Sequence, residues 1–388
     1  MHWKISCRRF PILIPMCSYE KRKETDIMNL AEQELFWSLC KFLDPDRERI
    51  KDLLQEGAGT PAVLGQLLYN RMGGVAYQTI YRTETAGYAP REFRNALRDA
   101  WQIGKDKNKS YARGRSFVSE ILEKSGAEYV LLKGAYLCDQ YPPGCRTAND
   151  VDVLTQGKWV TQIGNALRAA GFLQGAIRNG VFTPANRQEI LQTKMMRGET
   201  VPYFLEVDFP YMQYLEVDIN FSLDYKNTAD TALPAFLSDF RMRGTCRLPS
   251  PPHFLLHLCT HLYKEAATYP WVQMRRDMSL YKFCDLYFLL YAYTLEDYGL
   301  LLTETKKYDL TLQCYYALEM MRALFQLKDP MLLGFLARIT PPDPDVLDRV
   351  LDPAGKKEYR YAEKDVRRRF FEKDRLALLK EVCPDAQR

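Results

Sequence analysis

The chain has 388 residues, of which 47% are hydrophobic and 27% are charged, and its formal net charge is +5. These values exclude a disordered or fibrous chain and indicate a globular protein with room for two or three compact units. The mild excess of positive charge permits anionic ligands such as nucleotides but does not require a nucleic acid.

The cysteines and the apolar segments indicate a compartment. Ten cysteines are scattered without a CxxC pair, which favours reduced thiols and predicts a cytoplasmic location. No apolar run approaches the length of a membrane-spanning helix, so we expect no membrane association. The short apolar stretch within residues 1–27 is broken by Pro11 and Pro15 and lacks a small-residue cleavage site. We predict a disordered extension there, not a signal peptide.

The hydrophobic pattern changes twice along the chain. Helical spacing dominates residues 28–115, and a long polar-faced helical segment ends at Gly126. Strand-like segments follow, with a helix at residues 158–172 between them. We therefore predict an α+β protein with a mixed β-sheet core at residues 116–225. Helical regions at residues 28–115 and 226–388 flank this core.

The last segment of the chain is strongly charged. Residues 356–380 are predicted to form a basic helix in which arginines are interleaved with Phe370 and Phe371. Acidic residues are mixed in throughout, so a solvated amphipathic helix is our first interpretation. Contact with RNA or another polyanionic acceptor is the alternative.

A pair of carboxylates indicates a metal site. Asp150 and Asp152 are two residues apart on a predicted strand, so both side chains point to the same face. Two such carboxylates repel each other unless a cation lies between them. Mg²⁺ (or Mn²⁺) binds oxygen ligands and leaves positions for phosphate and water.

A third carboxylate can come from a later strand. In the alternating segment 215–220, Glu216 or Asp218 can complete a triad if that strand lies beside the first. One member can then take the proton from an attacking hydroxyl group. Glu206 and Asp208, in a similar LEVD segment, are rivals for this role.

Candidate phosphate ligands precede the two aspartates. Lys133 and Gly134 lie where an apolar strand turns into a helix. There glycine allows a close backbone approach, and free N–H groups at the helix start can bind phosphate. Arg146, four residues before Asp150, can bind a phosphate oxygen bidentately. No Walker loop is present.

Three histidines lie at four-residue intervals on one predicted helix, at His253, His257 and His261. Positions i and i+8 are about 12 Å apart along a helix, too far for one ion to bind all three. Two of them can share a metal with Asp277 or Asp285. We favour instead that the histidines form hydrogen bonds across the helix packing or line the cleft, with His261 closest to the nucleotide.

The segment LLKGAYLCDQYPPGCRTANDVDVL at residues 131–154 resembles the signature of the uncharacterised nucleotidyltransferase family in the DNA polymerase β-like superfamily. The similarity continues through ALRAAGF and LEVDINFSL into the following helices and covers about residues 28–292. It implies a nucleotidyltransferase-type mixed β-sheet core at residues 116–225 and two-metal transfer of a nucleoside monophosphate (NMP). Asp150 and Asp152 would be metal ligands and Asp218 the third carboxylate, preferred because NFSL after LEVDI also fits the family pattern.

Two positions depart from the wider pattern. Lys133 and Gly134 stand where the superfamily usually has Gly-Ser, although the lysine agrees with this branch. Asn220 stands where many relatives of this branch have histidine, which puts that histidine's role in doubt here.

The expected function is transfer of an NMP from a magnesium-bound nucleoside triphosphate (NTP) to a hydroxyl-bearing acceptor, with release of pyrophosphate. The acceptor is a small molecule, a protein or an RNA end. Lys133, Gly134 and Arg146 would bind the phosphates. The alternative is a non-catalytic nucleotide-sensing or RNA-binding protein that keeps the fold. The sequence carries no signal for the base, the acceptor or the oligomeric state.

Overall fold

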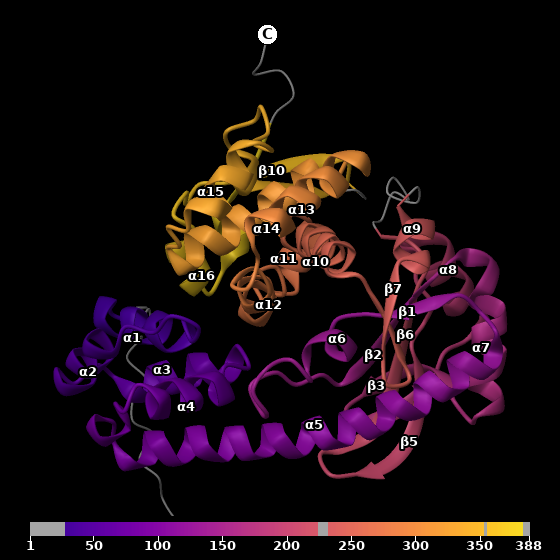
Figure 1. The fold of residues 1–388 in the computed structure, drawn as a ribbon, viewed down its shortest axis with the longest axis horizontal. Coiled ribbons are helices and arrows are strands. Elements are labelled where there is room, and N and C mark those ends of the chain that lie inside the picture. The colour runs from indigo at the N-terminus through magenta and orange to yellow at the C-terminus, as the bar shows by residue number, and fades with distance from the viewer. Residues whose placement is uncertain (1–27, 224–231, 353–354, 383–388) are drawn as a thin grey trace, which may run out of the picture.

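The computed structural model describes residues 28–223, 232–352 and 355–382. The predicted extension at residues 1–27 and the predicted boundary between residues 225 and 226 both lie outside these ranges. In the described residues, a mixed sheet follows the N-terminal helical region in the chain and precedes the C-terminal one. Figure 1 shows the sheet at the right, with the N-terminal helices at the lower left and the C-terminal helices at the top. The predicted α+β class is therefore confirmed.

The N-terminal region consists of four short helices and one long helix. The bounds are α1 (Leu30–Cys40), α2 (Arg47–Gln55), α3 (Thr60–Tyr69), α4 (Gly73–Arg82) and α5 (Arg91–Ser125). Helix α5 ends at Gly126, which has a positive φ of 71°, as its C-cap, and glycine adopts this conformation without a steric penalty. In Figure 1, α5 runs from the N-terminal helices to the sheet. The domain boundary predicted between residues 115 and 116 lies inside this helix.

The central sheet has six strands in the order β1-β2-β6-β5-β3-β4. The strands are β1 (Tyr129–Leu131), β2 (Asp150–Thr155), β3 (Leu173–Arg178), β4 (Val181–Pro184), β5 (Tyr203–Phe209) and β6 (Met212–Asn220). The helices between them are α6 (Gly134–Leu137), α7 (Val160–Ala169) and α8 (Arg187–Arg197). Only β2 and β6 pair in parallel, and the other neighbours are antiparallel. The sequence patterns missed β3, β4 and α8, because most residues of the two strands are partly or fully exposed and show no alternation.

Strand β6 follows its sequence pattern closely. Leu215, Val217 and Ile219 are fully buried, while Glu216 and Asp218 lie between them in the sequence. Because successive strand side chains point to opposite faces, the apolar residues reach the core and the acidic residues reach the other face. In β2 the burial does not alternate, because Asp150 is partly exposed and the other five residues are buried.

The C-terminal region is mainly helical and contains two small sheets. Its helices are α9 (Leu233–Ser238), α10 (Pro251–Ala266), α11 (Tyr269–Gln273), α12 (Leu280–Leu290), α13 (Leu295–Lys307), α14 (Thr311–Phe325), α15 (Pro330–Ala337) and α16 (Val366–Phe371). Its strands are β7 (Phe240–Arg243), β8 (Cys246–Pro249), β9 (Arg349–Asp352), β10 (Lys357–Tyr361) and β11 (Leu379–Glu381). Strand β8 packs close to β1, so this region is attached directly to the central sheet.

The basic helix predicted for residues 356–380 was wrong. This segment forms β10, the six-residue helix α16 and the start of β11. Phe370 and Phe371 are buried against Phe36 and Trp37 of α1, and the neighbouring Arg369 is 1% exposed. Pairing of β10 with β9 and β11 overrides the helical pattern. The two aromatic rings therefore belong to the core and offer no stacking surface to RNA.

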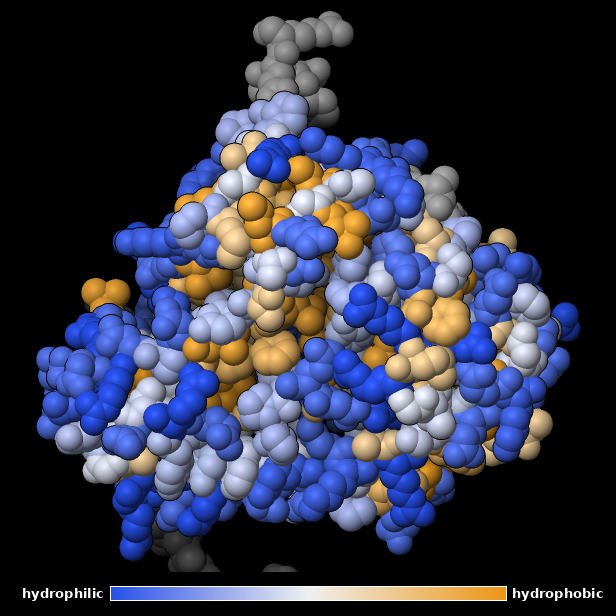
Figure 2. Space-filling model, viewed as in Figure 1, coloured by the Kyte–Doolittle hydropathy of each residue, from blue (hydrophilic) through white to orange (hydrophobic). Residues whose placement is uncertain are grey.

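The surface is mostly hydrophilic on the face that Figure 2 shows, and hydrophobic residues gather over the C-terminal helices there. None of the described helices combines the length and the apolar character that crossing a bilayer requires.

Candidate functional site

A cleft of about 630 Å³ lies over the acidic face of β2 and β6. Residues of β3, the segment 199–202 and helices α8, α10 and α12 also line it. Small-molecule sites in proteins typically measure about 300–1,000 Å³. The cleft is therefore large enough for a nucleotide. Its lining includes the three predicted metal ligands and the three predicted phosphate ligands: Asp150, Asp152, Asp218, Lys133, Gly134 and Arg146.

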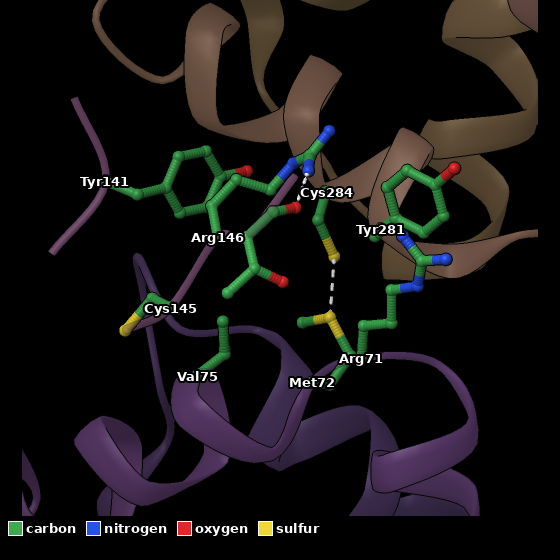
Figure 3. Close-up of a pocket in the computed structure, with 9 residues that line it drawn as sticks. Arg71, Met72, Val75, Tyr141, Cys145, Arg146, Tyr281 and Cys284 are labelled. Atoms are coloured by element: carbon green, nitrogen blue, oxygen red, sulfur yellow. Dashed lines mark hydrogen bonds between the residues drawn. The ribbon is translucent and has the colours of Figure 1, made fainter. Parts of the chain in front are cut away.

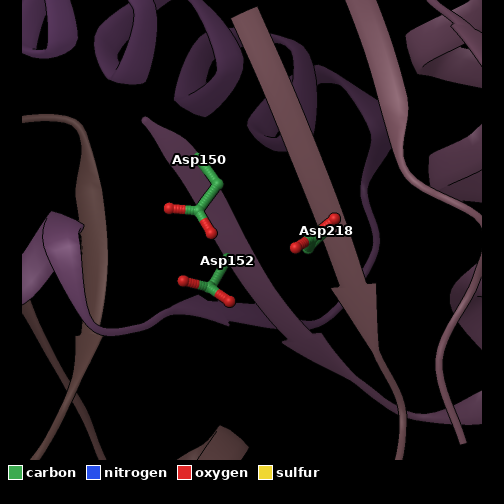
Figure 4. A group of neighbouring side chains, drawn as sticks. All are labelled: Asp150, Asp152 and Asp218. Atoms are coloured by element: carbon green, nitrogen blue, oxygen red, sulfur yellow. The ribbon is translucent and has the colours of Figure 1, made fainter. Parts of the chain in front are cut away.

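Three aspartates converge at the floor of this cleft. In the parallel ladder, Asp152 stands opposite Asp218, and Asp150 stands opposite Glu216. One carboxylate oxygen of Asp150, one of Asp152 and one of Asp218 lie within 4.8 Å of one another. Figure 4 shows the first two on one strand and Asp218 on its neighbour. The structure thus brings together the triad that the family resemblance implied.

The electrostatics of the triad favour a bound cation. Asp152 is 1% exposed, and its Oδ2 atom is buried without a hydrogen-bond partner among the described residues. Burial raises the pKa of Asp152 to about 6. Burial, together with the carboxylates of Asp152 and Glu216, raises the pKa of Asp218 well above its usual value. Carboxylate oxygens crowded in this way are a suitable donor set for a hard divalent cation such as Mg²⁺ or Mn²⁺.

Glu216 is a fourth carboxylate of the same face, and the sequence offered it only as an alternative to Asp218. Burial raises its pKa to about 7, and the neighbouring Asp150 adds to the shift. Both Glu216 and Asp218 line the cleft, so β6 contributes two acidic groups instead of one.

Lys133 lies beside the triad at the turn between β1 and α6. Its Nζ donates a hydrogen bond to Oδ1 of Asp152 over 2.7 Å. Burial lowers the pKa of Lys133, but the carboxylates of Asp152 and Asp150 outweigh that effect and raise it. The lysine therefore stays charged and occupies one oxygen of Asp152, which leaves the other oxygen free for a metal ion.

Gly134 allows tight packing at this turn. A Cβ atom added there would lie 2.8 Å from the hydroxyl oxygen of Tyr111 and would also collide with Ala148. Helix α6 has only four residues, so its macrodipole is small. The importance of Gly134 lies in close packing near the strand that carries Asp150.

Arg146 is placed differently from its predicted role as a phosphate ligand. Its Nε and Nη2 atoms donate to the carboxylate of Asp285 on α12, each over 2.9 Å. Its Nη1 atom donates to the carbonyl oxygen of Thr147. Its guanidinium carbon lies 4.9 Å from the centre of the Tyr281 ring. Arg146 was predicted to bind a phosphate oxygen bidentately. In the structure its bidentate partner is instead the carboxylate of Asp285.

The two rivals for the third carboxylate lie elsewhere. Glu206 and Asp208 of β5 are exposed and do not line the cleft. Their segment has the same LEVD sequence as the one in β6, but β5 is not a neighbour of β2 in the sheet. The two LEVD segments have the same sequence, but the strand order places only the one in β6 beside β2.

The histidines form no three-ligand site. His253 lies 3.1 Å from Glu304 and 3.2 Å from Asp239, which agrees with hydrogen bonds across the helix packing. His261 lines the cleft, and burial lowers the pKa of His257 beside it to about 3. Among the described residues, the aspartate triad is the one set of three or more potential ligands close enough to hold an ion.

Four basic residues that sequence reasoning missed also line the cleft: Arg71, Lys264, Arg276 and Lys282. Two of them, Lys282 and Arg71, lie next to the ion pair of Arg146 with Asp285. Lys282 of α12 forms an ion pair with Glu265 of α10, and Arg71 comes from the turn between α3 and α4. Both line the cleft. No motif marks either residue, because each reaches the site only through packing of distant helices.

A family model described as an uncharacterised nucleotidyltransferase matches residues 59–326. The match includes the triad, Lys133, Gly134 and the helices that wall the cleft. No curated protein and no solved structure matches the chain.

Proposed function

The chain belongs to the uncharacterised nucleotidyltransferase family, whose model covers more than half of it, and from this premise we propose that it transfers an NMP from an NTP to a hydroxyl group. The products are the nucleotidylated acceptor and pyrophosphate. The acceptor is a small molecule, a protein or an RNA end.

One observation carries the proposal: the converging carboxylate oxygens of Asp150, Asp152 and Asp218 at the floor of the cleft. These residues would hold Mg²⁺ or Mn²⁺. The bound metal would neutralise charge on the phosphates and polarise the α-phosphorus. The unpartnered Oδ2 of Asp152 supports this reading, because a buried polar atom without a partner is costly.

A side chain of the protein accepts the proton that the acceptor hydroxyl loses. In the proposed step, the carboxylate of Asp218 accepts the proton of the acceptor hydroxyl. The hydroxyl oxygen forms a bond to the α-phosphorus, and the bond from this phosphorus to the leaving pyrophosphate breaks. Lys133 holds Asp152 in place, and the segment Lys133–Gly134 lies beside the phosphates.

The free thiols support a reducing compartment. All seven cysteines in the described ranges are free and buried, so we propose the cytoplasm as the location.

Labelled nucleotides test the reaction type. The protein is incubated with Mg²⁺ and each NTP, labelled on the α or the γ phosphate, in the presence of cell lysate or total RNA. We expect transfer of the α label, loss of transfer in Asp152→Asn, and normal transfer in Asp208→Asn, whose site lies outside the cleft.

Other outcomes would change the assignment. Transfer of the γ label would mean phosphoryl transfer and overturn the mechanism. Tight NTP binding without transfer of either label to any acceptor would favour the nucleotide-sensing alternative.

A further inference from the structure

Arg71 brings a positive charge into the cleft from outside the sheet. It lies in the turn after α3 with a positive φ of 61°, and its exposed side chain lines the cleft. It forms no ion pair within the part of the chain that the structure describes. Figure 3 shows Arg71 extending from the N-terminal helices toward Tyr281 of α12.

Arg71 and Arg146 share the same aromatic ring. Their guanidinium carbons lie 5.1 Å and 4.9 Å from the centre of the Tyr281 ring. Arg146, however, is buried and bound bidentately to Asp285. Arg71 therefore occupies the neighbourhood in which a phosphate-binding arginine was predicted, and its donors are available to a ligand.

Other basic residues lie in the same cleft as Arg71 and the aspartate triad. Lys282 directly follows Tyr281, and its ion pair with Glu265 is mostly buried. Lys133 and Arg146 both contribute to the electrostatic field at Lys282, as does Arg71. Basic residues from three separate regions thus lie in one cleft beside the triad. Part of their charge is balanced by Asp152, Glu265 and Asp285, and Arg71 adds a charge that is not balanced.

We propose that Arg71 binds the terminal phosphates of the NTP, so that the N-terminal helical region forms part of the nucleotide site. This inference rests on the proposed function. A triphosphate carries several negative charges, and a metal ion held by the triad would neutralise only some of them. Arginine binds phosphate oxygens bidentately. In this arrangement Arg146 is a positioning residue that holds α12, and with it Tyr281 and Lys282, against the loop before β2.

Comparing NTP with NMP binding tests the inference. An NMP lacks the terminal phosphates, so a ligand of those phosphates affects the NTP alone. We would measure binding of each Mg²⁺–NTP and its matching NMP by calorimetry, for the wild type, Arg71→Gln and Arg71→Lys. Arg338→Gln is the matched control, because Arg338 is exposed at the end of α15, outside the cleft.

We expect Arg71→Gln to weaken NTP binding about 10- to 100-fold, the effect of losing a charged hydrogen-bonded pair. NMP binding should change less than about twofold, Arg71→Lys should be intermediate, and Arg338→Gln should match the wild type. Tripolyphosphate should compete with NTP more weakly in Arg71→Gln. Unchanged NTP binding, or an equal loss for NTP and NMP, would overturn the inference. So would a loss of NTP binding in Arg276→Gln, another arginine that lines the cleft, when Arg71→Gln binds normally.

The results also separate the two proposals. NTP binding that depends on Arg71, without transfer of the α label, overturns the proposed function and keeps the inference. Transfer of the α label, together with NTP binding that is independent of Arg71, keeps the proposed function and overturns the inference about Arg71. A folded wild-type protein that binds no NTP overturns both.

Discussion

Arg146 and Asp285 are 139 residues apart in the sequence and form a buried bidentate ion pair. Arg146 is 8% exposed and Asp285 is 2% exposed. The pair joins the loop that precedes β2, the strand that carries Asp150 and Asp152, to the helix α12, which carries Tyr281 and Lys282. The cleft's shape therefore depends on a contact between the central sheet and the C-terminal helices.

Removing one partner of this pair should be strongly destabilising. Asp285→Ala leaves the guanidinium of Arg146 buried without its counter-ion, and such changes cost about 3–5 kcal/mol. Urea unfolding followed by circular dichroism measures the loss. The exposed pair Arg98–Asp99 is the control, and Asp99→Ala should cost less than about 1 kcal/mol. A similar small loss for both variants would show that the buried pair does not hold the two regions together.

The identity of the third carboxylate can be tested by two matched substitutions. Asp218→Asn should lower nucleotidyl transfer by at least about 10³-fold, because a metal ligand contributes several kcal/mol of transition-state stabilisation. It should also weaken Mn²⁺ binding, measured by electron paramagnetic resonance. Asp208→Asn should leave both unchanged, because its side chain is exposed on β5. If Asp208→Asn lowers transfer and Mn²⁺ binding while Asp218→Asn does not, the third carboxylate is Asp208 of β5.

The metal-free protein should lose stability as the pH rises. Burial raises the pKa of Asp152 to about 6, above the value of about 3.9 in an unfolded chain. Between these values the folded protein holds a proton that the unfolded chain releases. The contribution of this group is thus fully present below about pH 4 and is lost as the pH rises through 6, by up to about 3 kcal/mol. Glu216, whose pKa is raised to about 7, extends the decline towards neutral pH.

Thermal unfolding with EDTA or Mn²⁺ at pH 5.0 and 7.5 measures this effect. Metal binding requires ionised carboxylates, so the gain in Tm from Mn²⁺ should be larger at pH 7.5. Asp152→Asn should remove most of the difference. An equal gain at both pH values in the wild type would contradict the prediction.

A methyl group at Gly134 should disturb the site through packing. Gly134→Ala places a Cβ atom 2.8 Å from the hydroxyl oxygen of Tyr111 and against Ala148, and overpacking of this kind costs about 1–3 kcal/mol. Because the collision displaces the loop before Asp150, activity should fall along with stability. The control is Gly299→Ala in α13, where an added Cβ meets no atom within 4 Å. That variant should be stabilised by up to about 1 kcal/mol. Equal stability of the two variants would mean that α6 adjusts freely.

The sequence by itself determined the features that depend on neighbouring residues. The end of α5 at Gly126 follows from glycine's tolerance of a positive φ. The shared face of Asp150 and Asp152, and the acidic face of β6, follow from the two-residue period of a strand. These features are local because backbone geometry repeats over a few residues.

Tertiary structure decided which charges meet and which segments become buried. Strand order placed Asp218 beside Asp152 and left Asp208 at the surface, although both lie in LEVD segments. Packing gave Arg146 a carboxylate partner on α12 and brought Arg71 into the cleft. It also turned the charged C-terminal segment into strands around a short helix. The free energy of a charge or an aromatic ring depends on its burial and its partners. These are supplied by residues far away in the chain, which no local pattern identifies.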